Sequence, residues 1–207
     1  IPPHAVASLV SALWRAASSG DAASGQLQEA AKTTEGVRAL VFVFARDEAG
    51  AAPQARALAG IVLKNAVKAG QCALDDATVW YLMSEVPRRL ADPLKLVRST
   101  ACLVIAQMVA KTRVLEGGAR IVDELIQAVS APHPPDSALL DGATLCLLRL
   151  AEDAGDKLDS DEAGRPLVRL VPLWIALLGH ADATARERAL DSLACYVETM
   201  PAALAVN

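Results

Sequence analysis

Apolar residues recur at every third or fourth position along most of the chain, which is the spacing of one face of an α-helix. Gly, Pro, Asp and Ser interrupt this pattern at short intervals, as they do at the ends of helices. The pattern therefore predicts ten helices, near residues 4–18, 22–32, 35–46, 53–69, 76–90, 93–111, 118–131, 136–154, 165–179 and 182–199. The helices come in pairs, which is typical of repeat proteins.

Four of the predicted helices begin with a similar segment: ARALAG at 55–60, VRSTAC at 97–102, LDGATL at 140–145 and ARERAL at 185–190. The second positions of these segments are Arg56, Arg98, Asp141 and Arg186, which are separated by 42, 43 and 45 residues. A period in the low to middle forties is typical of HEAT and armadillo repeats.

The order of residues within a unit favours HEAT repeats. In the last unit Pro172, His180 and Arg186 stand eight and six residues apart, at the places of the helix-A proline, the inter-helix loop and the helix-B arginine. Asp92 and Arg98 keep the six-residue interval, as the loop acid and the helix-B arginine. Three residues depart from the HEAT pattern, in place of the proline, the loop acid and an arginine: Ser84, His180 and Asp141.

These observations predict an all-α fold, a HEAT-repeat α-solenoid that forms a right-handed superhelix of about five antiparallel helix pairs. The units are expected at about 1–34, 35–70, 71–112, 113–155 and 156–207. The first helix of each pair (A) should lie outside and the second (B) should line a concave face. We also predict a structural ladder of helix-B arginines and loop acids that joins the units, made of Arg56, Asp92, Arg98 and Arg186.

Composition narrows the classes of function. Hydrophobic residues make up 53% of the chain and aromatic residues 3%, which suits closely packed helices. The net charge is −4 and the basic residues form no stripe, so binding to nucleic acid is not predicted. The longest charge-free apolar runs, 99–110 and 170–181, are well short of the ~20 residues that cross a bilayer, so membrane insertion is not predicted either.

Motifs for catalysis and metal binding are missing from the sequence. It contains no GxSxG, P-loop, GxGxxG or HExxH motif, and we predict that the chain is not an enzyme and needs no cofactor. The cysteines form no CxxC pair, so they are expected to be small core residues: Cys72, Cys102, Cys146 and Cys195. The N-terminus has no initiator Met and no basic n-region, which predicts a fragment or processed form without a secretion signal.

The segment ARALAGIVLKNAVKA at 55–69 resembles the second helix of the second repeat in importin-beta (karyopherin-beta) nuclear transport receptors. A narrower resemblance, to the transportin (karyopherin-beta2) branch, is carried by LVRSTACLVIAQMVAK at 96–111, LRLAEDAGDKLDSDEAGRPL at 148–167 and VPLWIALLGHADATARERAL at 171–190. The region from about 20 to 70 is similar to the importin N-terminal region. The resemblance implies that the chain is a single N-terminal arch, with about five of roughly twenty HEAT repeats.

In this family the N-terminal arch binds the small GTPase Ran in its GTP form, which controls cargo release, and cargo binds mainly to the C-terminal arch. The resemblance therefore implies a transport receptor that shuttles between the cytoplasm and the nucleus. Its implied partners are Ran in the GTP form, protein cargo at the missing C-terminal repeats, and nucleoporins.

Helical spacing indicates which B-helix residues would meet a partner. Counting from Arg56 places Ala59, Leu63 and Ala66 or Val67 in the core. The opposite, concave-facing side would hold Ala57, Ile61, Lys64, Asn65, Lys68, Ala106, Gln107, Ala110, Arg149, Leu150, Asp153, Ala194, Cys195 and Glu198. The resemblance assigns contact with the GTPase to Lys64, Asn65, Lys68, Gln107, Arg149 and Asp153.

Three other interpretations are open at this point. The lysines at the end of the 53–69 helix could be solvated and stabilised only by the helix dipole. The chain could be a generic HEAT scaffold or regulatory subunit that shares the architecture alone. An armadillo cargo adaptor should have a third short helix per repeat and Trp–Asn pairs along its groove, whereas Trp14, Trp80 and Trp174 fall on predicted A helices.

Overall fold

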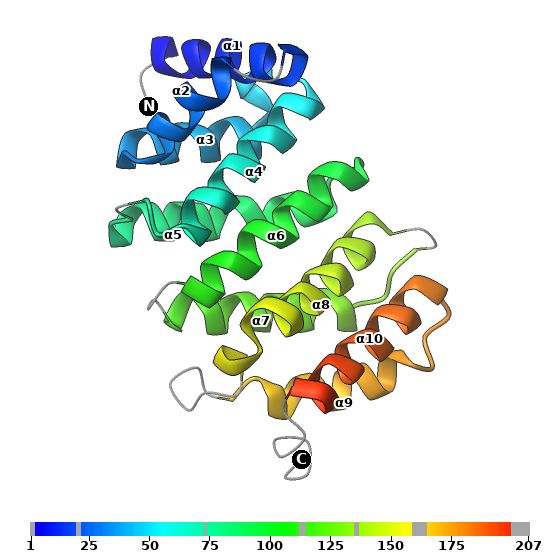
Figure 1. The fold of residues 1–207 in the computed structure, drawn as a ribbon. Coiled ribbons are helices and arrows are strands. Elements are labelled where there is room, and N and C mark those ends of the chain that lie inside the picture. The colour runs from blue at the N-terminus through cyan, green and yellow to red at the C-terminus, as the bar shows by residue number, and fades with distance from the viewer. Residues whose placement is uncertain are drawn as a thin grey trace.

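The computed structural model describes residues 3–19, 22–72, 74–111, 115–134, 137–158 and 165–199. These residues form α-helices and two short 3-10 helices and contain no strand (Figure 1). The α-helices are α1 (Pro3–Ser19), α2 (Ala22–Ala31), α3 (Thr34–Ala45), α4 (Pro53–Lys68), α5 (Asp76–Glu85), α6 (Lys95–Lys111), α7 (Leu115–Ser130), α8 (Ala138–Leu158), α9 (Leu167–Leu177) and α10 (Ala183–Thr199); the 3-10 helices are η1 (Asp47–Ala49) and η2 (Val86–Ala91). The predicted all-α fold is confirmed.

The helices pair in chain order, and the pairs stack on one another. α1 packs on α2, α3 on α4, η2 on α6, α7 on α8 and α9 on α10. We call α1, α3, α5, α7 and α9 the A helices and α2, α4, α6, α8 and α10 the B helices. From α4 onward each B helix also packs against the next one, and Figure 1 shows these four helices side by side along the stack. The chain is therefore a solenoid of helix pairs.

The helix ends follow local sequence rules. α4 begins at Pro53, whose missing N–H would have no helical partner in any case, and Gly70 follows the helix with a φ of 63°, a left-handed conformation that favours glycine. Asp75 caps α5 by accepting a hydrogen bond from the Thr78 N–H at 2.7 Å. Hydrogen bonds from Thr78 and, more weakly, Arg38 hold the pKa of the Asp75 carboxyl below its usual value.

Two elements differ from the sequence prediction for identifiable reasons. The helix predicted over 76–90 changes to the 3-10 helix η2 at Val86, because Pro87 has no N–H to donate to the Met83 carbonyl. Arg120 from α7 donates to that carbonyl instead, at 3.4 Å. The helix predicted over 136–154 continues to Leu158, with one non-helical residue at Ala154 (φ −138°, ψ 22°).

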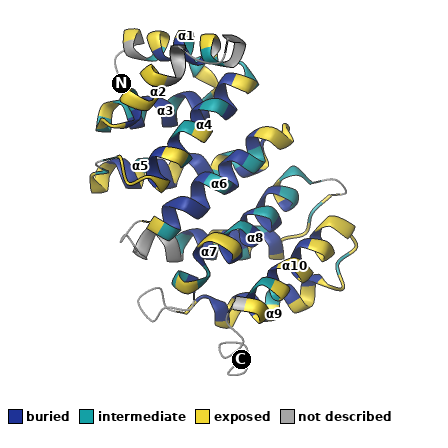
Figure 2. Cartoon of the chain, in the orientation of Figure 1, coloured by how far each residue is buried: buried dark blue, intermediate teal, exposed yellow. Residues whose placement is uncertain are grey.

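Buried residues run along each of the four stacked B helices (Figure 2). Four buried alanines, one on each helix, and four buried aliphatic residues one turn later belong to the core: Ala59, Ala101, Ala143 and Ala185, then Leu63, Ile105, Leu147 and Ala189. The core positions expected on α4, including Ala59 and Leu63, are confirmed.

The helix starts agree with the unequal spacings found in the sequence. Each of the four anchor residues donates its backbone N–H to the carbonyl four positions earlier, so all four occupy the same place in the first turn of their B helices: Arg56, Arg98, Asp141 and Arg186. Arg98 and Arg186 also donate to the carbonyls five and six residues before them, in the loop that precedes each helix. The spacings of 42, 43 and 45 residues therefore reflect repeats of slightly different length.

Glycine is required at two of the closest contacts between units. A Cβ on Gly142 of α8 would lie 2.0 Å from the Leu90 carbonyl oxygen, and a Cβ on Gly60 of α4 would lie 2.5 Å from Thr100 Cγ2 on α6. A side chain at Gly142 would meet backbone, and one at Gly60 would displace the packed side chains of Thr100 and Phe44. The close packing of α8 on η2 and of α4 on α6 therefore depends on these two residues.

Candidate functional site

The exposed sides of α4, α6, α8 and α10 form one continuous surface, which we call the B-helix face. We sort its residues into three sets, of which Gln107 alone is buried: Ile61, Leu103, Leu145 and Glu187; Asn65, Gln107, Arg149 and Asp191; Lys68, Ala110, Glu152 and Ala194. The first set is apolar on α4, α6 and α8 and acidic on α10. The B-helix face is therefore apolar along part of its length and flanked by amide and charged groups.

Three of the sequence-predicted contact residues lie together near the end of α4. Asn65 and Lys68 are exposed and Lys64 is half-buried, with the three side chains on adjacent positions of one helical face. No side-chain hydrogen bond or ion pair joins any of the three to another described residue. Lys68 is the last residue of α4, where a cation also interacts favourably with the helix dipole. These groups are available to a partner.

The other three predicted contact residues are engaged within the chain. Gln107 is buried on α6, and its Nε2 donates to Asp153 Oδ2 on α8 at 3.1 Å. Arg149 is half-buried and forms an ion pair with Glu152 one turn later on α8. The structure therefore brings Gln107 and Asp153 into contact with each other, while Arg149 keeps a partner of its own.

Four residues placed on the exposed side by sequence offsets are buried instead: Ala57, Ala106, Gln107 and Leu150. Their predicted exposure was wrong. α6 and α8 each pack between two neighbouring B helices, which buries part of the side that the offsets left exposed.

A ladder of arginine–aspartate contacts joins the units at the starts of the B helices. The Arg56 side chain is 10% exposed, and its Nη2 lies 2.7 Å from Asp92 Oδ2 in the next unit. The same guanidinium donates to the Phe44 carbonyl at 3.3 Å. Arg98 donates to the Asp92 and Pro93 carbonyls and reaches Asp141 on α8, with its Nη2 2.7 Å from Asp141 Oδ2.

Asp141 is the centre of this ladder because it accepts from arginines of two different helices. Arg188 Nη2 of α10 lies 2.6 Å from Asp141 Oδ1, opposite Arg98 of α6. Burial raises the pKa of the Asp141 carboxyl, but the hydrogen bonds and charges of Arg98 and Arg188 outweigh it, so the pKa lies below its usual value. One carboxylate thus ties together three consecutive B helices.

Sequence reasoning did not find Arg188. It singled out Arg186, which is exposed and donates to the His180 and Ala181 carbonyls of its own loop at 2.8 and 2.9 Å. Arg188 is buried on the side of α10 that also buries Ala185 and Ser192, three residues before it and four residues after it. This helical spacing was the signal that could have distinguished the two arginines.

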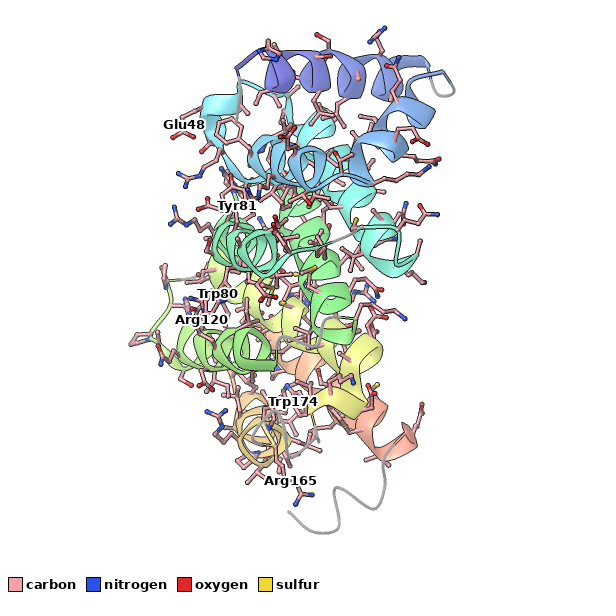
Figure 3. The ribbon with its side chains drawn as sticks, turned by 90° about the vertical axis from the view of Figure 1, so that its left-hand side faces the viewer. Glu48, Trp80, Tyr81, Arg120, Arg165 and Trp174 are labelled. Carbon is pink, nitrogen blue, oxygen red and sulfur yellow. The ribbon has the colours of Figure 1, made fainter. Side chains whose placement is uncertain are left out.

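The A helices present a second surface with a groove (Figure 3). A groove of about 720 Å³ lies between α1, α3 and α5 and is lined partly by Phe42 and Tyr81, with Arg38 and Glu48 among its polar residues. Trp80 also projects from α5, and the Arg120 guanidinium carbon lies 5.1 Å from the centre of its ring. Figure 3 shows Trp80 and Arg120 next to each other on this side.

The described residues offer little for chemistry. Within them, no three His, Cys, Asp or Glu side chains come together in a way that could hold a metal ion. None of their helices combines the length and the apolar character that crossing a membrane requires. Cys102 and Cys146 are buried thiols, and Cys72 and Cys195 are half-buried, all unbridged. The site geometry is suited to binding a protein surface.

Comparison with known proteins gives the decisive observation. Over 81% of its length the chain is 31% identical to transportin of Dictyostelium discoideum, and over 86% it is 30% identical to transportin-1 of Oryza sativa subsp. japonica. Importin subunit beta-2 of Schizosaccharomyces pombe is 30% identical over 69% of the chain. The chain is related in sequence to the transportins. The resemblance to the transportin branch that the sequence motifs carry is confirmed.

The chain spans 17% and 20% of the lengths of the two transportins from Dictyostelium discoideum and Oryza sativa. No family model matches it. Among solved structures, two designed armadillo repeat proteins match this chain with TM-scores of 0.44 and 0.39 at 16% and 18% sequence identity. The matches cover 94% and 92% of this chain and 98% and 81% of the designed chains.

Proposed function

We propose that this chain is part of a nuclear transport receptor of the transportin type and that its B-helix face binds the small GTPase Ran in the GTP form. The proposal has no catalytic or cofactor role for the chain. Protein cargo would bind to repeats outside the chain, and the receptor would move between the cytoplasm and the nucleus. Nucleoporins would be further partners.

The observation that carries the proposal is the α4 cluster of Lys64, Asn65 and Lys68. The LKN segment is the part of the chain that first resembles the importin-beta family, and in the fold its polar groups are unpaired and lie on one exposed side of a B helix. A solvated helix end accounts for Lys68 through the dipole, but it does not account for an adjacent free amide and a second lysine. The transportin relatives support a transport role over a generic scaffold.

The contacts found on α6 and α8 narrow the proposed interface. Because Gln107 is bonded to Asp153 and Arg149 to Glu152, these residues shape and stiffen the surface beside α4, and they contact Ran through atoms left free by their internal partners. The anchors are then Asn65 and Lys68. Interface energy is concentrated in a few central residues, so loss of an anchor should cost about 1–2 kcal/mol or more.

The test is a calorimetric titration of the 207-residue chain with Ran loaded with GTP or with GDP. We expect clear preference for the GTP form and a loss of that affinity in the Asn65→Ala, Lys68→Glu double variant. Circular dichroism on each variant controls for folding. Equal affinity for the two nucleotide forms, or binding of neither, would contradict the proposal and leave a scaffold without GTPase control.

A further inference from the structure

Unpaired charges on the B-helix face separate by sign along the stack. The positive end consists of Lys64 and Lys68 on α4 and Lys111 at the end of α6. The negative end lies on α10 and consists of Glu187, Asp191 and Glu198, which are all exposed. None of these six side chains has an ion-pair or hydrogen-bond partner among the described residues.

The two ends meet between α6 and α8. On α6 the exposed side is apolar at Leu103 and Ala110 before it reaches Lys111, and on α8 Arg149 is paired with Glu152. Asp153 of α8 is exposed and, among the described residues, accepts a hydrogen bond only from the neutral Gln107 amide, so this side of α8 adds to the negative end. Positive charge therefore gathers on α4 and α6, and negative charge gathers on α8 and α10.

The local structure explains the positive end but not the negative one. Lys68 and Lys111 end their helices, where the helix dipole favours cations. Glu198 lies in the last turn of α10, where the same dipole disfavours an anion, and α10 has no basic residue in that turn to compensate. Asp191 lies four residues after Glu187, so the two like charges also repel along the helix. These acids reduce the stability of α10 locally, which is understandable if a cationic surface binds there.

We propose that the B-helix face is a bipolar docking surface. Its occupant is a folded protein partner with acidic groups that lie over α4 and α6 and basic groups that lie over α10, with an apolar contact between them at Ile61, Leu103 and Leu145. Complementary charge at both ends fixes the direction in which the partner lies along the stack, since the reverse orientation places like charges together. This inference rests on the proposed function, because the partner tested is the GTP form of Ran.

Two charge reversals test the inference. One variant carries Lys64→Glu and Lys68→Glu at the positive end, and the other carries Asp191→Lys and Glu198→Lys at the negative end. The two variants shift the net charge by the same amount in opposite directions. Control variants each reverse one exposed charge away from the surface, Lys95→Glu at the start of α6 and Glu35→Lys at the start of α3, and they are compared with the single variants Lys68→Glu and Asp191→Lys. Neutral Gln or Asn replacements at the same positions serve where a reversal fails to fold.

We expect both reversals to weaken binding of the GTP form of Ran at least about tenfold and to reduce its salt dependence, with the controls within about twofold of wild type. A partner of one sign would give opposite effects: an acidic partner would bind the α10 variant more tightly. That result, or no effect of the α10 variant, would overturn the inference while leaving the proposed function intact. Failure of the wild-type chain to bind the GTP form would instead defeat the proposed function.

A second copy of the chain is the competing occupant, because two opposite ends of one surface could pair with each other. Sedimentation of the chain alone distinguishes this case. We expect a monomer whose sedimentation does not change in either variant. Dimers that both reversals dissociate would show that the surface joins copies of the chain, and they would overturn the assignment to a different protein.

Discussion

Asp141 is predicted to be the most sensitive polar residue of the stack. Replacing it with Ala removes the carboxylate that Arg98 and Arg188 share, and their side chains, only 11% and 9% exposed, would keep their charges without an acidic partner. Breaking a buried ion pair by removing one partner costs about 3–5 kcal/mol. Because the Asp141 side chain is itself 24% exposed and water can reach the arginines, we expect the lower end, about 3 kcal/mol.

The assay is urea unfolding followed by far-UV circular dichroism, with the slope of the free energy against urea compared between variants. For a chain of this size about 3 kcal/mol corresponds to a fall in Tm of roughly 6–12 °C. Arg188→Ala should cost a comparable amount, and Asp141→Ala with Arg188→Ala together should cost less than the sum of the two. Arg186→Ala on the same helix is the matched control and should cost about 1 kcal/mol or less. Equal costs for Arg186→Ala and Arg188→Ala, or a change below about 0.5 kcal/mol for Asp141→Ala, would refute the reasoning.

Three further predictions concern the same stack. Gly142→Ala should destabilise the chain by about 1–3 kcal/mol or more in thermal unfolding, because its Cβ would lie 2.0 Å from the Leu90 carbonyl oxygen. Gly25→Ala in α2 is the control: its Cβ would meet nothing within 4 Å, so it should be neutral or stabilising by up to about 1 kcal/mol. Because the pKa of Asp141 is lowered by folding, its stabilising contribution is complete above its unfolded pKa of about 3.9 and is lost as the pH falls through the lower folded value. The difference in unfolding free energy between wild type and Asp141→Asn should therefore disappear below about pH 4 and persist at higher pH, as measured by urea unfolding at a series of pH values. The Trp174 indole N–H is buried and has no hydrogen-bond partner among the residues that the structure describes, so Trp174→Phe should cost less than about 1.5 kcal/mol while Trp174→Ala costs about 3–5 kcal/mol. A large loss with Phe would point to a polar role for the indole.

Helix positions and the repeat were accessible from the sequence because they depend on local rules. Pro53 and Gly70 delimit α4 in the sequence as they do in the structure, and the Ala- and Leu-rich periodicity places the core rows. The change to 3-10 helix at Val86 has a local cause, because Pro87 has no N–H to donate to the Met83 carbonyl. That carbonyl instead accepts a hydrogen bond from Arg120, which lies on another helix. A rule about proline alone does not predict that contact.

The residues that the sequence misplaced are those whose environment depends on neighbours far along the chain. Arg186 and Arg188 are two residues apart in the same short segment, and the contact of Arg188 with Asp141, 47 residues earlier, requires the packing of α10 on α8. Ala106 and Leu150 are buried for a similar reason, since B helices on both sides enclose α6 and α8. For the candidate site, the α4 group was found because Asn65 and Lys68 lie on the exposed side of α4 that helical spacing predicts. The contact of Gln107 with Asp153 required the packing of α6 on α8.

The central claim is that the α4 end of the B-helix face binds Ran in its GTP form. The measurement that tests it most directly is a calorimetric titration of the GTP form into two single variants, Lys68→Glu at the end of α4 and Lys95→Glu at the start of α6, which make the same charge change at exposed lysines. The account predicts at least about a tenfold loss of affinity, roughly 1.4 kcal/mol, for Lys68→Glu and a change of less than about twofold for Lys95→Glu. Equal affinities for the two folded variants would contradict it.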